Sequence, residues 1–192
     1  HVAFRTLGLD HLGIASFEKI FLHHGYEKKE FYSFEAKKLN AYWYAPPTRN
    51  LPRIFISELR VNDLSEKAQN IIHKYTNSIK SDPVDSLNLN QPSEVIEFFE
   101  KPLWELPTLE DYNVLLNESE YAAWVIYNRY YLNHYTISVH ELPDGFDRLE
   151  KFNLFLSELD IKLNDAGGVI KTSKDGLLLQ SSSVAEMITA TF

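Results

Sequence analysis

The chain opens with His1-Val2-Ala3-Phe4-Arg5-Thr6, and a stretch of the same character, Asn133-His134-Tyr135-Thr136-Ile137-Ser138-Val139, follows much later. Both stretches are rich in β-branched and aromatic residues, which predicts a strand for each. Each strand has a histidine near its start, so aligning the two strands places His1 on His134. These two strands divide the sequence, and the segments around them decide the fold.

The residues that follow each histidine strand predict the same order of elements. After the first, apolar residues at helical spacing over 16–22 predict a helix that stops at Gly25, and strands are predicted at 30–34, 39–44 and 53–59. After the second, we predict an amphipathic helix over 146–159, then strands at 169–172, 177–181 and 185–192, with a hairpin turn at Lys174-Asp175-Gly176. Each end of the chain thus predicts β-α-β-β-β, although identity between the two ends is too low to prove a repeat.

The middle of the chain has helical character. Periodicity and capping residues predict helices over 64–79, 93–99 and 109–130, separated by proline-containing turns. We therefore expect a single α+β domain over residues 1–192, made of module one at 1–60, a helical insertion at 61–130 and module two at 131–192. The two βαβββ modules are expected to form an incomplete barrel. Neither end carries a turn signal, so we expect the chain to be truncated at both ends.

Composition excludes several classes of protein. Of 192 residues, 44% are hydrophobic and 14% aromatic, which is typical of a soluble globular protein, and no apolar run approaches the roughly 20 residues of a membrane helix. The 19 basic and 27 acidic residues give a net charge of −8 without any basic run, so we expect neither nucleic acid nor a membrane as a partner. With no cysteine, a metal must bind His, Asp or Glu, and a reducing compartment, the cytoplasm, is expected.

The alternation of side chains along a strand indicates which residues could bind a metal together. Side chains two residues apart share a face of a strand, so His1 and Arg5 point the same way. Glu186 is the only charged residue between positions 177 and 192, and an isolated carboxylate among apolar strand residues needs a partner. Two imidazoles and one carboxylate form the facial triad of non-haem iron enzymes, which leaves positions open for substrate and O₂. The spacing of His1, His134 and Glu186 is not itself a signature.

Several strings of the sequence resemble one family. They are His1-Val2-Ala3-Phe4-Arg5-Thr6, Arg53-Ile54-Phe55-Ile56-Ser57-Glu58-Leu59-Arg60, Asn133-His134-Tyr135-Thr136-Ile137, and Gln180-Ser181-Ser182-Ser183 with Glu186. In these strings the chain resembles the 2-oxoadipate dioxygenase/decarboxylase family, also called hydroxyglutarate synthase, over nearly its whole length. That family is similar in fold to the vicinal oxygen chelate superfamily.

The resemblance implies a catalytic metal and a substrate. It implies that His1, His134 and Glu186 bind Fe(II), or another divalent ion, and that Arg5 binds a substrate carboxylate. The reaction implied is the oxidative decarboxylation of a 2-oxo dicarboxylic acid, with 2-oxoadipate and O₂ giving 2-hydroxyglutarate and CO₂. The oligomeric state is left open.

The other histidines are weaker candidates. His11 is the competing first ligand, but it lies between the first strand and the first helix and has no counterpart in module two. His140 follows the second histidine strand, and it could at most contact a residue that binds the metal. We expect His23 and His24 at a helix end, and His73 on an amphipathic helix, to be surface residues.

Several residues have a structural interpretation beside the functional one. Arg5 could pair with Asp10 or Glu58 instead of a substrate. Glu58 could either accept a hydrogen bond from a metal ligand or be an ion-pair partner of Arg60, and the structural role is preferred. A cluster of aromatic residues before the second histidine strand is more typical of helix packing than of a substrate cage, although its place allows it to roof the site. Its members are Trp104, Tyr112, Tyr121, Trp124, Tyr127, Tyr130 and Tyr131.

Three rival functions remain open at this stage. A lyase or isomerase of the same superfamily would use the metal only as a Lewis acid, and a hydrolase would use metal-bound water. A binding module without enzymatic activity is the third.

Overall fold

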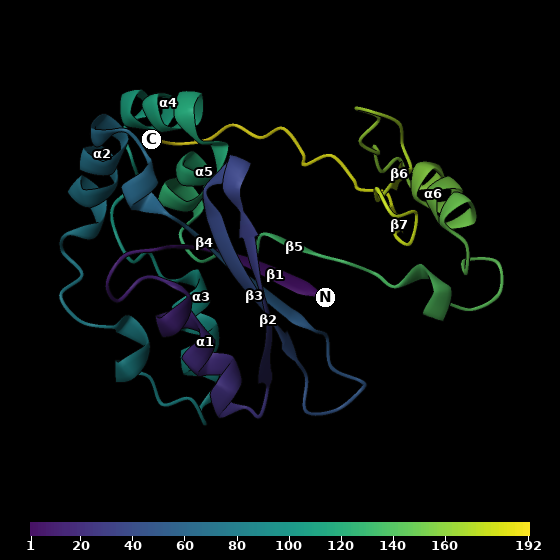
Figure 1. Cartoon of the computed structure of the whole chain (residues 1–192), viewed down its shortest axis with the longest axis horizontal. Coiled ribbons are helices and arrows are strands. Elements are labelled where there is room, and N and C mark those ends of the chain that lie inside the picture. The colour runs from purple at the N-terminus through teal and green to yellow at the C-terminus, as the bar shows by residue number, and fades with distance from the viewer. The chain divides into compact units, whose positions relative to one another are not determined.

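The computed structural model describes all of residues 1–192 and contains a mixed five-stranded sheet, several helices and a short hairpin (Figure 1). The helices and strands are β1 Val2–Leu7, α1 Ile14–His23, β2 Glu27–Phe34, β3 Leu39–Ala45, β4 Ile54–Leu59, α2 Glu66–Thr76, α3 Pro92–Glu100, α4 Leu109–Glu118, α5 Glu120–Asn128, β5 His134–Tyr135, α6 Leu149–Glu158, β6 Lys171–Thr172 and β7 Leu179–Gln180. The chain divides into two compact units, His1–Thr136 with Phe192, and Ile137–Thr191.

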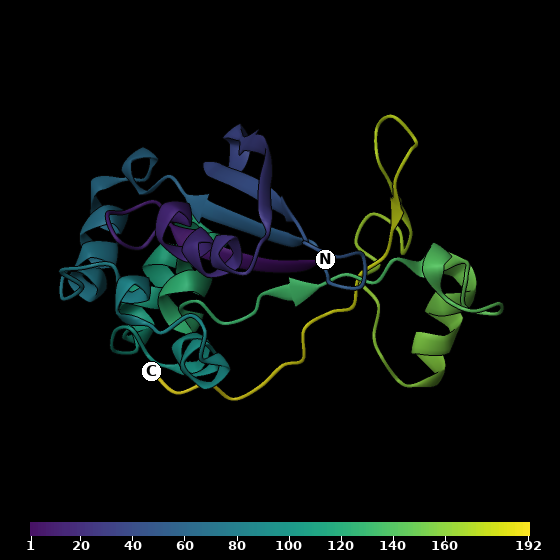
Figure 2. The same cartoon turned by 90° about the horizontal axis from the view of Figure 1, so that it is seen from below.

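The sheet of the first unit has the strand order β2-β3-β4-β1-β5 (Figures 1 and 2). Strand β1 runs parallel to β4, with Phe4 opposite Ile56, and the other neighbouring pairs are antiparallel. Strand β5 pairs with β1 at one end only, where His134 lies opposite Ala3. The last strand of the unit therefore returns beside the first.

One face of the sheet carries the aromatic core. The ring of Phe4 lies 5.0 Å from that of Phe17 on α1 and 5.4 Å from that of Phe99 on α3. Burying an aromatic side chain of this size stabilises the fold by roughly 1.5–3 kcal/mol. Because neighbouring residues of a strand point to opposite faces, Ala3 and Arg5 project away from this core.

Three of the α-helices begin at a residue whose side chain satisfies a free backbone N–H group. The hydroxyls of Ser65, Thr108 and Ser119 accept hydrogen bonds at the starts of α2, α4 and α5. Helix α1 has no such cap, and instead Glu58 of β4 accepts a hydrogen bond from the N–H of Ile14 at 2.8 Å. A carboxylate from the sheet thus caps the first helix.

The predicted elements of the first unit agree with the structure, with one correction. The predicted helix stop at Gly25 is confirmed by its φ of +82° and by its N–H donating to the carbonyl of Leu22. Residues 109–130 were predicted as one helix, which is wrong, because Ser119 is extended at φ −149° and ψ 105° and separates α4 from α5.

The second unit contains α6 and the hairpin β6–β7. The helix predicted over 146–159 is confirmed in the shorter range of α6, and the turn at Lys174-Asp175-Gly176 is confirmed as a hairpin. Gly176 supplies the positive φ of +73° that this turn needs. The hydroxyl of Ser181 donates to the side-chain oxygen of Asn153 at 2.6 Å, which ties the hairpin region to α6.

Three predictions for module two need correction. The strand predicted at 133–139 is limited to His134–Tyr135, because its ladder with β1 ends at His1 and residues 139–141 turn into a 3-10 helix. The strands predicted at 169–172 and 177–181 form only two paired residues each. Residues 185–192 form no strand, since no neighbouring strand pairs with them. The structure accordingly shows an α+β fold with an open sheet, and it does not show the expected barrel.

Candidate metal centre

The pairing of β1 with β5 brings two histidines together. The N–H of Thr136 donates to the carbonyl of His1 at 2.7 Å, and Ala3 lies opposite His134. The two imidazole rings have centroids 5.8 Å apart and planes at 75°. Because opposite residues of an antiparallel pair share a face, His134 stands on the face of β1 that carries Arg5.

The ring of His134 is oriented by its neighbour. Its Nδ1 lies 2.7 Å from Oδ1 of Asn133, an oxygen that can only accept, so Nδ1 carries the proton and Nε2 keeps a free lone pair. Desolvation by surrounding protein atoms lowers the pKa of His134, and the charge of Arg5 lowers it further, although the residue stays exposed at the rim of the site. A neutral, oriented imidazole is the form that binds a metal.

The guanidinium of Arg5 is held beside the two histidines. Its Nη1 donates to Oε1 of Glu120 at 3.0 Å, and its central carbon lies 4.9 Å from the ring centroid of Tyr121 and 5.1 Å from that of Trp124. Arg5 pairs with neither of the carboxylates considered from the sequence, Asp10 and Glu58. Its Nε and Nη2 donate to no protein group, and its side chain is 22% exposed.

A cleft of about 460 Å³ in the first unit connects Arg5 and His134. It contains both positive and negative groups, with Lys37 and Lys38 contributing cations and Glu118 and Glu120 contributing carboxylates. The remaining lining residues are Ala3, Phe4, Phe34, Ala36, Leu39, Phe55, Ser57, Ser119, Tyr121 and Asn133. The cleft is large enough for a small organic acid.

A buried hydrogen-bond network forms the floor of this cleft. The hydroxyl of Tyr121 donates to the carbonyl of Ser57 at 2.9 Å, lies 2.9 Å from the Ser57 hydroxyl, and accepts from the N–H of Thr6 at 3.1 Å. Burial raises the pKa of Tyr121, so the phenol stays neutral. The sequence carried no signal for Ser57, which looks like any polar residue of a strand.

Glu186, the third predicted ligand, belongs to the second unit. It is exposed and lies outside any strand, and no group of three His, Cys, Asp or Glu side chains in the structure could hold a metal ion. The first unit nevertheless places two imidazoles side by side, and this donor type suits divalent transition metals. The donor types of this pair therefore suit a metal, and the full ligand set of His1, His134 and Glu186 remains a prediction.

The competing histidines lie on other elements of the chain. His11 sits in an exposed turn with φ +68°, and His140 lies in an exposed 3-10 helix. His23 contacts Oδ1 of Asn90 at 2.9 Å, His24 is exposed, and His73 is half-buried on α2.

The members of the aromatic cluster occupy different positions. Trp104 and Tyr130 are core residues, since each is buried and donates to a backbone carbonyl, of Ile126 and Leu12 respectively. Tyr121 lines the cleft. Trp124 contacts Arg5. Tyr112 and Tyr127 pack on Phe192, each with its ring centroid 5.1 Å from that of Phe192. Tyr131 is exposed.

Arg60 pairs with Glu35 and Asp63, so its considered pairing with Glu58 is wrong. Glu58 has the structural role of capping α1.

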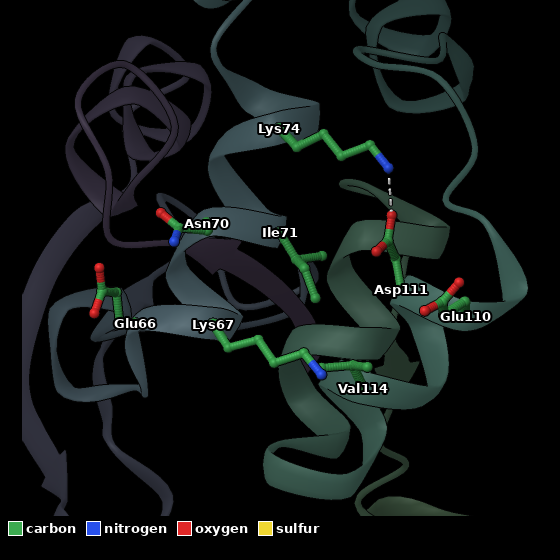
Figure 3. A pocket seen from close by; sticks show the side chains of 8 residues that line it. All are labelled: Glu66, Lys67, Asn70, Ile71, Lys74, Glu110, Asp111 and Val114. Carbon is green, nitrogen blue, oxygen red and sulfur yellow. Dashed lines mark hydrogen bonds and ion pairs between the residues drawn. The ribbon is translucent and has the colours of Figure 1, made fainter.

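A second hollow, of about 490 Å³, lies between α2 and α4 (Figure 3). Its side chains are mixed in charge, and Lys74 forms an ion pair with Asp111 at 2.6 Å. It contains no histidine and lies apart from the cleft described above.

No helix of the structure is both long enough and apolar enough to cross a membrane. The fold resembles that of a solved glyoxalase superfamily protein from Ralstonia eutropha JMP134, with a TM-score of 0.76 and 20% identity over 98% of this chain and 63% of that chain. The model of the 2-oxoadipate dioxygenase/decarboxylase family matches residues 1–192. The chain belongs to this family, and the description of the family as dioxygenases suggests a metal cofactor.

Two relatives from rice make the similarity specific. The 2-oxoadipate dioxygenase/decarboxylase, chloroplastic/amyloplastic, of Oryza sativa subsp. japonica is 44% identical over 202 residues, which cover 100% of this chain and 54% of that protein. The crystal structure of the Oryza sativa hydroxyglutarate synthase in complex with 2-oxoadipate has a TM-score of 0.82 and 43% identity, covering 97% of this chain and 61% of that chain. The chain thus spans about half the length of the curated relatives that it matches.

Proposed function

We propose that the protein containing this chain is an Fe(II)-dependent dioxygenase and decarboxylase that converts 2-oxoadipate and O₂ to 2-hydroxyglutarate and CO₂. The observation that carries the proposal is that His134 and an incompletely paired Arg5 line one cleft, with the ring of His1 beside that of His134. Membership of the 2-oxoadipate dioxygenase/decarboxylase family supports the same reaction.

The proposed metal ligands are His1, His134 and Glu186. The lowered pKa of His134 and the hydrogen bond to Asn133 favour the neutral imidazole with a free Nε2 that ligation requires. Fe(II) would supply the redox chemistry with O₂ when bound, whereas a divalent ion without redox activity, such as Zn²⁺, would supply only Lewis acidity.

The chain's own residues bind and orient the substrate in this proposal. The free Nε and Nη2 of Arg5 match the two oxygens of a carboxylate, which they would hold bidentately. The buried phenol of Tyr121 keeps the floor of the cleft rigid and neutral. The acid is thereby held between the arginine and the imidazoles.

We further propose the domain organisation expected from the sequence. Residues 1–192 would form one domain in which modules 1–60 and 131–192 build an incomplete barrel of the vicinal oxygen chelate type. The helical insertion at 61–130 would cover one side, and the contact of Trp124 with Arg5 supports such a role for α5. Glu186 would then complete the metal centre from module two.

The proposed partners are a small 2-oxo acid and O₂, without nucleic acid or membrane. We place the protein in the cytoplasm, because a chain without cysteine suits a reducing compartment. The plastid location in the name of the rice relative, chloroplastic/amyloplastic, describes the rice protein.

The test is an oxygen-electrode assay of Fe(II)-loaded full-length protein with 2-oxoadipate, in which CO₂ release is followed in parallel. We expect equal O₂ uptake and CO₂ release, and neither in the absence of oxygen. Product formed under strict anaerobiosis would favour a lyase or isomerase, and cleavage of a model ester supplied in a separate assay would favour a hydrolase. Metal binding without turnover of any substrate would favour a binding module without enzymatic activity.

A further inference from the structure

The guanidinium of Arg5 is flanked by two aromatic rings of α5. Tyr121 and Trp124 are three residues apart, so both project from one side of the helix. Their ring centroids lie 4.9 Å and 5.1 Å from the central carbon of the guanidinium. Contacts of this length between an arginine and an aromatic face are attractive.

The two rings differ in what else they do. Tyr121 is buried and its hydroxyl bonds to Thr6 and Ser57, so its position serves the sheet as well. Trp124 is only partly buried, whereas its neighbours Ala123 and Val125 are fully buried in the core. The indole of Trp124 therefore packs both against the edge of the core and against the guanidinium of Arg5.

The hydrogen bond to Glu120 uses one end of the guanidinium. Only Nη1 of Arg5 is occupied, at 3.0 Å from Oε1, and the Nε and Nη2 edge is left for a ligand. A planar fork recognises a carboxylate through two parallel hydrogen bonds only if its plane is fixed. The rings restrain that plane, and Glu120 restrains rotation within it.

We propose that Trp124 is a positioning residue that gives the site its preference for dicarboxylic over monocarboxylic 2-oxo acids. It acts through Arg5, by holding the guanidinium edge toward the second carboxylate of the substrate. This inference rests on the proposed function and deepens it, because it assigns substrate selectivity to a residue of the helical insertion.

The experiment compares two acids of equal length that differ only in the second carboxylate, 2-oxoadipate and 2-oxohexanoate. Anaerobic calorimetric titration of the Fe(II)-loaded full-length protein gives Kd for each, and the oxygen electrode gives KM and kcat. The variants are Trp124→Leu, which removes the ring, and Trp124→Phe, which keeps an aromatic face. Trp43→Leu is the matched control, because it removes a similar contact, with Arg53 at 5.3 Å, outside the cleft.

For Trp124→Leu we expect Kd and KM for 2-oxoadipate to rise about five- to tenfold, with the constants for 2-oxohexanoate unchanged. Trp124→Phe should recover most of the selectivity, and Trp43→Leu should keep all of it. An equal loss for both acids, or no loss in Trp124→Leu, would overturn the proposal while the wild-type activity stands. Failure of the wild type to bind or turn over either acid would overturn the proposed function, and this inference with it.

Discussion

The phenolic oxygen of Tyr121 lies 2.9 Å from the hydroxyl oxygen of Ser57, and this contact joins α5 to β4 beneath the cleft. The same phenol also bonds to the carbonyl of Ser57 and to the N–H of Thr6. Because this network ties α5 to β1 and β4, the hydroxyl of Tyr121 contributes to the stability of the first unit and to the placement of the cleft floor.

Tyr121→Phe is therefore expected to destabilise the fold by about 1–3 kcal/mol, since a buried hydroxyl loses several partners at once while the ring is kept. Urea unfolding followed by circular dichroism measures the change. Tyr112→Phe is the matched control, because Tyr112 makes ring contacts without a hydrogen bond from its hydroxyl. Equal stability of the two variants would contradict the role of the network.

Acid stability is expected to depend on Asp82. Burial alone would raise the pKa of its carboxyl, but hydrogen bonds from Lys19, from the Ser16 hydroxyl and from the N–H of Val84 outweigh burial and lower the pKa. A carboxyl with a lowered pKa in the folded state stabilises the fold above its unfolded pKa of about 3.9, and this contribution is lost as the pH falls through the lower folded value.

Asp82→Asn should accordingly lower the free energy of unfolding at pH 7 by roughly 1–3 kcal/mol and flatten its fall below about pH 4. Denaturant unfolding across a pH series measures both effects. The control is Asp85→Asn, which removes an exposed carboxylate that bonds to the same Lys19. A wild-type slope in Asp82→Asn would show that the acid transition has another origin.

His134→Ala is expected to abolish stoichiometric metal binding without unfolding the protein, because the side chain is exposed and makes one hydrogen bond, to Asn133. Metal analysis of anaerobically purified protein, with circular dichroism for the fold, is the measurement. His140→Ala should keep its metal. Full metal content in His134→Ala would move the ligand assignment to His11 or His140.

Asn133→Ala tests whether the orientation of the His134 ring matters. Losing a partner that orients a ligand typically weakens metal binding by about 10- to 100-fold. Competition with a chromophoric chelator measures the affinity. An unchanged affinity would mean that other contacts orient the ring.

Arg5→Lys should raise KM for 2-oxoadipate by about tenfold although the charge is kept, because an ammonium group cannot make the bidentate contact. Steady-state oxygen uptake over a range of 2-oxoadipate concentrations is the assay. Lys37→Arg, which keeps a cation at an exposed position of the same cleft, serves as the control. Kinetics like those of the wild type in Arg5→Lys would make Arg5 a structural residue.

The sequence predicted those features that local pattern determines. The strands of module one and most helices follow from alternation, periodicity and turn residues, and the alignment of two histidine strands anticipated that His1 and His134 would lie close together. The break at Ser119 was missed because apolar residues continue at helical spacing on both sides of it.

Contacts between residues far apart in the chain could not be predicted from the sequence. Arg5 pairs with a carboxylate 115 residues away, and nothing local to either residue distinguishes Glu120 from the other exposed acids. The predicted strand at 185–192 failed for a related reason, since β-rich composition makes a strand only where a neighbour supplies hydrogen bonds. The role of Glu186 therefore stays a prediction.

Ser119 ends α4 and begins α5, and the acidic residues on either side of it point to different places. Glu118 binds the N–H and hydroxyl of Ser65 at the start of α2, while Glu120 binds Arg5 in the cleft. An α-helix turns by about 100° per residue, so one residue added or removed at this corner would swing Trp124 away from Arg5. Homologous chains that keep the contact of this tryptophan with this arginine should therefore show no change of length between the two acidic residues, however freely their surface loops vary.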